Sequence, residues 1–207
     1  MKQNTILIAI VALLIGGIGG YMIADKDEYG MEGMDHSMMM SEDSNEDRDD
    51  MPIDGMMGMD HGAMMVSSER EFVAGMIPHH QEAVDTANEV LARGGSTPEI
   101  RTLAEEIIAA QETEIAMLKE WHLAWYGEAY VEGDTYQPMM RDLSQLSGAE
   151  LDKRFLEDMI PHHMGAIMMA QSVRPYIEHQ EVTDMADAIM ETQTAEIELM
   201  RTLLKTL

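Results

Sequence analysis

The sequence predicts an all-α fold, in which a four-helix bundle is made of a duplicated helical hairpin. Two observations indicate it. The segment Phe72–His80, which ends in Met-Ile-Pro-His-His, returns as Phe155–His163 with the same ending. Signals for helix starts and ends also divide residues 67–207 into four helical segments. Two further regions precede this bundle: an apolar stretch in residues 1–24 and an acidic, methionine-rich linker in residues 25–66.

The first region, residues 1–24, is expected to be a transmembrane anchor or a cleaved signal segment. The chain is uncharged from Thr5 to Ala24, and roughly 20 apolar residues are enough to span a bilayer as a helix. Lys2 precedes this stretch and Asp25 follows it, which places the N-terminus in the cytoplasm and the remainder outside. We favour the anchor, because the apolar run is longer than that of most signal peptides. The expected location is the extracytoplasmic side of the cell envelope, periplasmic or on the outer face of the plasma membrane.

The second region, residues 25–66, has no helical or strand periodicity and is expected to be disordered by itself. A Gly-Met-Asp-His unit occurs in it twice, at residues 33–36 and 58–61. A thioether is a soft ligand and an imidazole a borderline one, and together they suit Cu(I) and Ag(I). The alternative is a low-complexity linker that drifted towards methionine. The candidate ligands are Met34, His36, Met38, Met59, His61 and Met64.

Composition narrows the functional classes. The chain has 39 Asp and Glu residues against 13 Lys and Arg, and a formal net charge of -26. Nucleic acid is therefore an improbable partner, whereas cations are attracted. There is no cysteine, which excludes disulfides and thiolate metal sites. The 24 methionines exceed what core packing needs, so a metal site in this chain would draw on thioether sulfur.

The boundaries of the four helices follow from capping signals. Ser68 with Glu71, and Ser147 with Glu150, match the capping box, in which a hydroxyl and a carboxylate satisfy the first backbone N–H groups of a helix. Thr97–Glu99 combines an N-cap residue, a first-turn proline and an acidic side chain. The predicted helices are 68–93, 97–126, 148–173 and 182–206, with a long crossover, 127–147, between the hairpins.

Each half of the bundle carries a Met-x-x-His-His constellation. Residues three and four apart are neighbours on a helix, so one methionine can approach both histidines that follow it. One sulfur and two nitrogens at one patch form a plausible site for a soft metal. The alternative is a set of core methionines and histidines, but four buried imidazoles without partners would be costly. The candidate ligands are Met76, His79, His80, Met159, His162 and His163, and in the sulfur-richer second half also Met164, Met168 and Met169.

Three other sets of residues allow more than one interpretation. Pro78 and Pro161 either kink a continuous helix just before each histidine pair or occupy the first turn of a shorter helix. His122 and His179 have no counterpart in the other half, and His179 is expected at the surface near a helix start. A last group of side chains either orients the imidazoles or lies in solvent, namely Gln111, Glu114, Gln193 and Glu196.

The duplicated Met-Ile-Pro-His-His segment, followed in each copy by Ala83 or Ala166, resembles domain-of-unknown-function family 305. The resemblance covers roughly residues 67–206. This family includes the CopM-like bacterial copper-binding proteins, which are placed near the ferritin-like helical bundles. The resemblance implies export, a ferritin-like four-helix bundle and copper binding by methionine and histidine without known catalysis. The first copy departs from the sulfur-rich version, since Gln81–Asp85 stands where the second has Met164–Met168.

The leading functional hypothesis is a non-enzymatic copper-binding protein that buffers, sequesters or transfers copper outside the cytoplasm. Cu(I) is favoured over Cu(II), and Ag(I) is a further candidate. The expected partners are copper ions, a copper-transfer protein and the membrane, reached through the N-terminal helix. The alternatives are a metal-independent interaction module and, less favoured, a ferritin-like metalloenzyme. The Glu-x-x-His pairs of di-iron proteins are absent, because methionine stands three residues before His79 and before His162.

Overall fold

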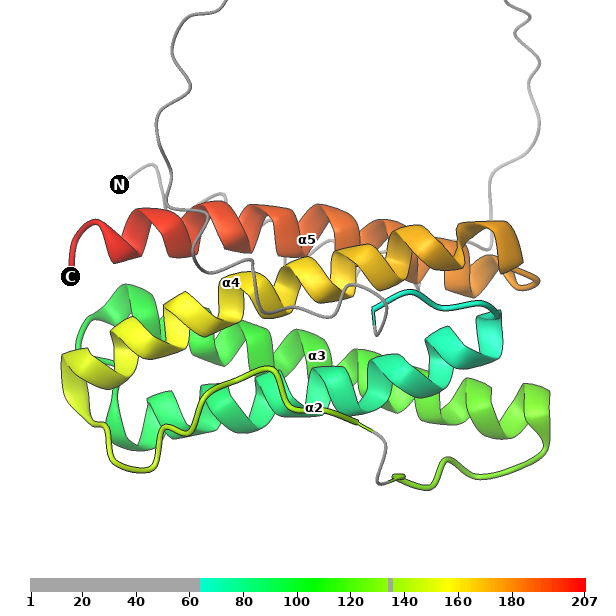
Figure 1. The fold of residues 1–207 in the computed structure, drawn as a ribbon, viewed down its shortest axis with the longest axis horizontal. Helices are drawn as coiled ribbons and strands as arrows, with labels where there is room; N and C mark the ends of the chain where they lie inside the picture. The colour runs from blue at the N-terminus through cyan, green and yellow to red at the C-terminus, as the bar shows by residue number, and fades with distance from the viewer. Residues whose placement is uncertain (1–63, 134–135) are drawn as a thin grey trace, which may run out of the picture.

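The computed structural model describes residues 64–133 and 136–207 and shows an all-α bundle (Figure 1). No strand occurs in these two ranges. The predicted all-α, four-helix fold is therefore confirmed. The elements are the helices α2 (Glu69–Arg93), α3 (Pro98–Tyr126), α4 (Gly148–Val173) and α5 (Gln180–Leu204), with a short 3-10 helix, η2 (Arg174–Tyr176), between the last two.

The four helices form two hairpins that pack on each other. α2 pairs with α3 and α4 pairs with α5, and the two hairpins meet mainly through contacts between α2 and α4 (Figure 1). A smaller contact joins α3 to α5. This arrangement brings together the two helices that carry the repeated histidine motif. The crossover, residues 127–147, connects the end of α3 to the start of α4 and passes in front of α2 in Figure 1.

The helix starts agree with the sequence in part. Ser68 and Thr97 are N-caps whose side chains accept hydrogen bonds from the backbone N–H of the residue three positions later. Ser147 makes no side-chain cap bond, so the second predicted capping box is wrong. Gly148 has a φ of 56° there, and the chain thus enters α4 without the geometry of a capping box. α5 begins at Gln180, two residues earlier than predicted. The carboxylate of Glu69 accepts a hydrogen bond from the backbone N–H of His179, the N-cap residue, and so fixes the start of the helix.

The two prolines of the repeated motif lie inside continuous helices. Pro78 is in the middle of α2 and Pro161 in the middle of α4. The alternative in which each proline starts a shorter helix is therefore wrong. A proline in a helix interior lacks the N–H that would bond to the carbonyl four residues earlier. Tertiary packing compensates for the lost bond, because Ile77 and His79 beside Pro78, and Met159 and His162 near Pro161, are buried in the bundle.

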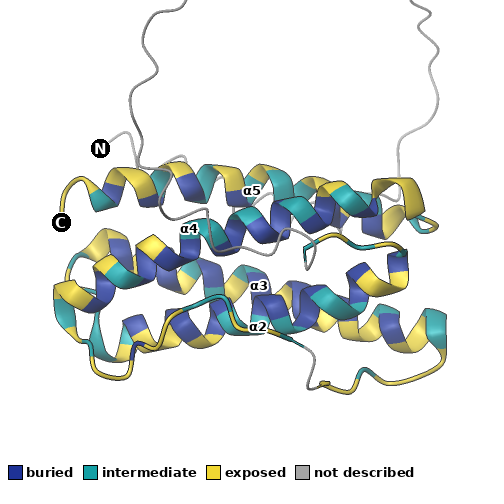
Figure 2. Ribbon diagram, viewed as in Figure 1, coloured by how far each residue is buried: buried dark blue, intermediate teal, exposed yellow. Residues whose placement is uncertain are grey.

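The core consists of two apolar clusters, and the histidines lie where one gives way to the other. Figure 2 shows buried residues on the helix faces that point towards the bundle interior. Along α2 the first cluster holds Phe72–Ile77 and the second holds Ala83–Val90, apart from Val84; along α4 the order is reversed. The motif histidines occupy the positions between, at residues 79–80 and 162–163. They are therefore placed at the middle of the bundle.

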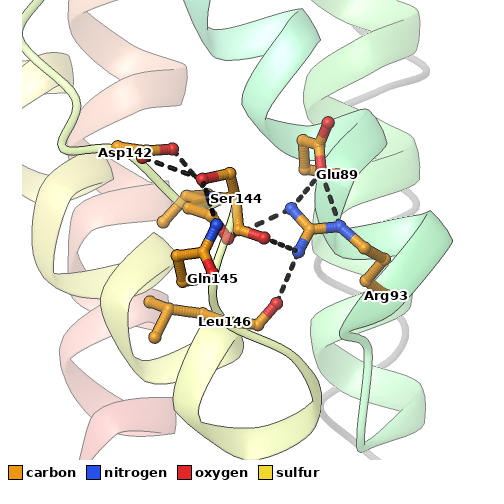
Figure 3. A network of polar contacts seen from close by, with 7 residues as sticks. Glu89, Arg93, Asp142, Ser144, Gln145 and Leu146 are labelled. Atoms are coloured by element: carbon orange, nitrogen blue, oxygen red, sulfur yellow. Dashed lines mark hydrogen bonds and ion pairs between the residues drawn. The ribbon is translucent and has the colours of Figure 1, made fainter.

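The crossover is attached to the bundle by polar contacts near its end. The guanidinium of Arg93, in the last turn of α2, donates to the carbonyl oxygens of Leu143, Ser144 and Leu146 and also pairs with Glu89 (Figure 3). Arg141, on the crossover itself, donates to the carboxylate of Asp158 on α4. Arg93 therefore satisfies backbone carbonyls of the crossover, and the two arginines together hold the crossover against α2 and α4.

Part of what the sequence predicts lies outside the described residues. This applies to the proposed anchor or signal segment in residues 1–24 and to nearly all of the linker in residues 25–66. Five of the candidate ligands belong to that part, namely Met34, His36, Met38, Met59 and His61. Of the helices in the described part of the chain, none combines the length and the apolar character needed to cross a membrane.

Asp152 ties the turn between α2 and α3 to α4. Its side chain is fully buried, and its two carboxylate oxygens accept the backbone N–H of Gly95 at 2.6 Å and of Ser96 at 2.7 Å. The Ser96 hydroxyl also donates to it. The carboxylate lies beside the N-terminal end of α3, where the helix dipole favours a negative charge.

We expect Asp152→Ala to lower the free energy of unfolding by about 2 kcal/mol, because it removes charge-assisted hydrogen bonds to backbone groups. Urea unfolding followed by circular dichroism measures this. Asp187→Ala is the control, since it removes only the exposed ion pair with Arg174 and is expected to cost less than about 1 kcal/mol. Equal effects of the two substitutions would contradict the assigned role of Asp152.

Candidate metal centre

Two histidines from equivalent positions of the repeat meet at the centre of the bundle. His79 of α2 and His162 of α4 have ring centroids 3.9 Å apart, with the planes tilted by 38°. Each side chain is only 1% exposed. Within residues 64–133 and 136–207, neither ring nitrogen of His79 has a hydrogen-bond partner. The structure thus brings together one histidine of each predicted constellation, and it leaves the nitrogens of His79 free to accept or donate.

The second histidine of each pair faces a carboxylate from the partner helix of its own hairpin. Nε2 of His80 lies 2.8 Å from Oε2 of Glu114 on α3, at ion-pair distance but outside hydrogen-bond alignment. Nε2 of His163 forms a 2.7 Å hydrogen bond with Oε2 of Glu196 on α5. Glu114 and Glu196 are equivalent residues of the repeat, so the two halves are related by approximate twofold symmetry. Of the two interpretations of these glutamates, the one in which they contact imidazoles matches the structure.

Gln111 and Gln193 extend this symmetric arrangement. Each lies three residues before the glutamate of its helix, and each is 3% exposed. Their Oε1 atoms are buried without a hydrogen-bond partner. Neither glutamine lies in solvent, which was one of the two interpretations for these positions. The interior between the four helices therefore contains polar groups from all four of them.

Glu82 is a site residue that the sequence did not single out. Its Oε2 lies 3.3 Å from Nε2 of His162. Its carboxylate also accepts the hydroxyl of Tyr136 at 2.5 Å and the backbone N–H groups of Met139 and Met140, each at 2.9 Å. Burial alone would raise the pKa of Glu82, but the contact with His162 and then the hydrogen bonds from Tyr136, Met140 and Met139 lower it to about 2. The ionised carboxylate therefore holds the crossover over the histidine pair.

The signal that could have identified Glu82 lies in the comparison of the two repeats. In the second copy Gly165 stands at the equivalent position, directly before Ala166, the counterpart of Ala83. A carboxylate against a glycine is a clear chemical difference between the copies, only three residues after the first histidine of each pair. Tyr136 and Met139, on the crossover, carry no repeat signal, and only the tertiary structure places them here.

The predicted methionines take different positions. Met76 and Met159 are fully buried, one in each apolar cluster, and Met169 is 5% exposed in the cluster of Met76. Their positions therefore suit core packing. Met164 and Met168 are half-buried on α4. Met64, the last candidate of the linker, is half-buried just before α2, with its sulfur beside Gly165.

The two histidines without a repeat partner lie elsewhere and use their nitrogens. Nδ1 of His122 contacts the carbonyl oxygen of Glu128 at 2.8 Å. Nδ1 of His179 lies 2.6 Å from a carboxylate oxygen of Glu69, and its ring stacks on Trp125 with centroids 3.7 Å apart. His179 is close to a helix start as predicted, but it is half-buried rather than simply on the surface. Both residues are part of local packing at the end of α3.

The electrostatics keep the central imidazoles uncharged. Burial lowers the pKa of His79 well below its ordinary value, and the neighbouring histidines, His162 first, lower it further. Burial also lowers the pKa of His162, although Glu82 opposes this shift. A neutral imidazole has a free electron pair on one nitrogen, which is the form that binds a metal ion.

The described residues contain no group of three or more His, Asp and Glu side chains arranged to hold a metal ion. A preformed oxygen and nitrogen cage of the kind that hard cations use is thus missing from this part of the chain. What the arrangement offers is a small number of neutral nitrogens with thioether sulfur nearby. This donor set suits a soft monovalent ion of low coordination number.

Comparison with known proteins places these features in a family. The sequence pattern described as "Domain of unknown function (DUF305)" matches the chain at residues 20–121 and 69–204. No sequence among the curated proteins matches it.

Several solved structures are similar to the bundle. CopM in the Cu(I)-bound form is 31% identical over 68% of this chain and 98% of CopM, with a TM-score of 0.62. CopM in the Cu(II)-bound form is 32% identical over 69% and 99%, with a TM-score of 0.61. A DUF305 fragment from Deinococcus radiodurans is 30% identical over 69% and 99%, with a TM-score of 0.59. The family resemblance found on the motif is thereby confirmed.

We expect the metal-free protein to lose stability as the pH falls below about 6.5, the pKa of an ordinary histidine. His79 and His162 have lowered pKa values in the folded state, so below pH 6.5 the unfolded chain binds protons that the folded chain does not. Their contribution is complete above that pH, and each can remove up to about 1.4 kcal/mol per pH unit below it. Urea unfolding between pH 5 and 8 measures the slope. It should be smaller in the double variant His79→Gln/His162→Gln; an unchanged slope would contradict the assignment.

Proposed function

We propose that this chain, which belongs to the DUF305 family, is a copper-binding protein of the cell envelope that buffers, sequesters or transfers copper. The observation that carries the proposal is the pair of buried, neutral imidazoles formed by His79 and His162. They come from equivalent positions of two repeats and meet at the middle of the bundle. Cu(I) is the favoured ion.

The unpartnered nitrogens are the first argument for a bound ion. Among the described residues, five of the eight ring nitrogens of His79, His80, His162 and His163 are buried with neither a hydrogen bond nor a carboxylate nearby. The Nε2 atoms of His80, His162 and His163 each face a glutamate. A buried polar atom without a partner costs roughly 1–3 kcal/mol, and most buried polar groups in proteins are satisfied. A metal ion that binds imidazole would compensate for part of this cost.

The donor types are the second argument, and they favour Cu(I). The chain has no cysteine, and the sulfur near the histidines is thioether sulfur. Thioether and imidazole select Cu(I) and Ag(I), whereas Cu(II) prefers tetragonal nitrogen and oxygen ligands. The similar structures of CopM contain Cu(I), Cu(II) or silver according to their titles, which supports copper and leaves Cu(I) as our choice on ligand chemistry.

Two carboxylates, those of Glu114 and Glu196, support the site. They lie beside His80 and His163, which we call the outer histidines. A histidine that binds a metal usually donates its other N–H to a carboxylate, which sets the orientation of the ring. Glu114 and Glu196 approach Nε2 of His80 and His163, so the Nδ1 atoms of these rings are the nitrogens left for an ion. We assign both glutamates this orienting role.

The cellular part of the proposal rests on the N-terminal regions. An anchor within residues 1–24 would keep the bundle at the membrane, on its extracytoplasmic side. The Gly-Met-Asp-His units of residues 25–66 would then supply further copper ligands near the bundle, and the net charge of -26 would raise the local concentration of cations. Passage of copper to a transfer protein would need no catalytic group.

We expect Cu(I) to raise the unfolding midpoint of the full chain, because an ion that binds only the folded state stabilises it, by about 2.7 kcal/mol when free Cu(I) is 100 times the dissociation constant. Binding to the linker alone cannot stabilise the bundle in this way. The measurement is thermal unfolding in detergent without oxygen, with and without Cu(I) set by a competing chelator.

Two matched variants test whether His79 and His162 are responsible for the stabilisation by Cu(I). His79→Gln/His162→Gln should abolish the stabilisation by Cu(I). His122→Gln, which changes a buried histidine remote from the pair, should keep it. A wild-type midpoint that does not respond to Cu(I), or a full response in the double variant, would overturn the proposed function.

A further inference from the structure

The central histidines are closed off from solvent in this structure. His79 and His162 are each 1% exposed. The space beside them is tightly packed, because a Cβ atom at Gly165 would lie only 3.1 Å from Nε2 of His79 and 3.4 Å from the methyl carbon of Met139. Neither ring is accessible to a solute in this conformation. Some part of the protein must therefore move before anything from solution can reach the pair.

One side of the pair is covered by a segment that is not helical. Residues 136–140 of the crossover, which we call the lid segment, lie over the histidines, and the ring centroid of Tyr136 is 6.5 Å from that of His79. Tyr136 is half-buried. Helices close the interior elsewhere, where Gln111 and Gln193 are each 3% exposed and the outer histidines are fully buried. Of the described parts of the chain around the pair, the lid segment can move with the least disturbance of helix packing.

The lid segment is held by one carboxylate. In the described ranges, every hydrogen bond of this segment goes to Glu82, which accepts the hydroxyl of Tyr136 and the backbone N–H groups of Met139 and Met140. Glu82 has a pKa of about 2, so the acceptor is ionised at neutral pH and its hydrogen bonds are charge-assisted. Release from this single side chain would free the whole segment.

The chain on the two sides of the lid segment is attached very differently. After it, the backbone N–H and the guanidinium of Arg141 donate to Asp158, and Leu143 is only 7% exposed. Shortly before it, residues 131–133 are exposed, and Val131 is exposed to 81%. The lid segment can therefore pivot about Arg141 while the helices keep their contacts.

We propose that the lid segment opens by release from Glu82 while the bundle stays folded, and that this opening is the route by which a solute reaches His79. The inference rests on the proposed function only in naming that solute as Cu(I). Glu82 also lies 3.3 Å from Nε2 of His162. The side chain that closes the lid is thus in contact with the pair that the lid covers.

Hydrogen exchange tests whether the opening is local. The sample is the metal-free full chain in detergent, labelled with 15N at methionine and followed by nuclear magnetic resonance. We expect the amides of Met139 and Met140 to exchange together, at a rate that low urea concentrations barely change, because a local opening exposes little surface. The amide of Met159, inside α4, should exchange through global unfolding and respond strongly to urea. An equal response of all three amides would overturn the inference.

Chemical modification tests whether the opening gives access to the pair. The rate at which diethyl pyrocarbonate modifies His79 is measured by mass spectrometry. Glu82→Gln keeps the size of the side chain but removes its charge, and it should raise both this rate and the exchange of the Met139 and Met140 amides at least about tenfold. Tyr136→Phe, which removes one hydrogen bond, should raise both by a smaller factor. The readout is His79 because Glu82 contacts His162 directly.

Two control variants separate opening of the lid from other effects. Tyr126→Phe removes a tyrosine hydroxyl that donates to a buried glutamate, Glu69, at the start of α2. Asp152→Ala lowers the stability of the whole bundle without a change at the lid. Both should leave the modification rate of His79 unchanged, with the half-exposed His179 as the internal reference for the reagent. A rise in Asp152→Ala as large as in Glu82→Gln would show that His79 reacts through global unfolding, and the inference would fail.

These measurements use no metal, so their failure differs from failure of the proposed function. If Cu(I) does not stabilise the wild type but His79 modification follows the exchange of the Met139 and Met140 amides, copper binding is wrong and the lid stands. If Cu(I) stabilises the wild type but these amides exchange only by global unfolding, or His79 modification does not follow them, the lid is wrong and copper binding stands.

Discussion

The burial of four histidine side chains, two on α2 and two on α4, is the constraint on which the other features of this structure depend. An apolar bundle would accept aliphatic residues at these positions at no cost, whereas imidazole nitrogens need partners. The other helices provide some of them: Glu114 from α3 and Glu196 from α5 each approach one outer histidine. In the described part of the chain, the central pair is contacted by one carboxylate, that of Glu82, which faces His162. The bundle is therefore closed and apolar at both ends and incompletely satisfied at its middle.

The duplication explains the symmetry of this centre, and the divergence of the copies explains its chemistry. Two hairpins with the same motif pack through their first helices, which places His79 against His162 and gives each outer histidine its own glutamate. Exact symmetry would give both central imidazoles the same environment. The exchange of Glu82 for Gly165 breaks it, since a carboxylate satisfies one ring and also holds the crossover through Met139 and Met140. The other ring has no carboxylate at hydrogen-bond distance among the described residues.

The contrast between packed helices and more adaptable connecting segments is consistent with the proposed binding of a soft ion. The helices fix the imidazoles, because the residues around them are packed and the rings are almost inaccessible to solvent. Met64, just before α2, and Met139, on the crossover, lie outside the helices, and their long side chains can rearrange at low cost. Thioethers carry no proton that must be lost before they bind an ion, and the central imidazoles are already neutral.

The sequence by itself determined the all-α class, the four helices to within two residues and the pairs of histidines, because capping residues, helical periodicity and an internal repeat are local patterns. It also indicated Glu114 and Glu196 as one of two alternatives. Only the tertiary structure decided that His79 and His162 meet, that Met76 and Met159 belong to the core clusters, and that Pro78 and Pro161 lie within continuous helices. The roles of Glu82, Tyr136 and Met139 were likewise beyond prediction. They depend on where the crossover passes over the bundle, and that path is set by long-range contacts that no local pattern encodes.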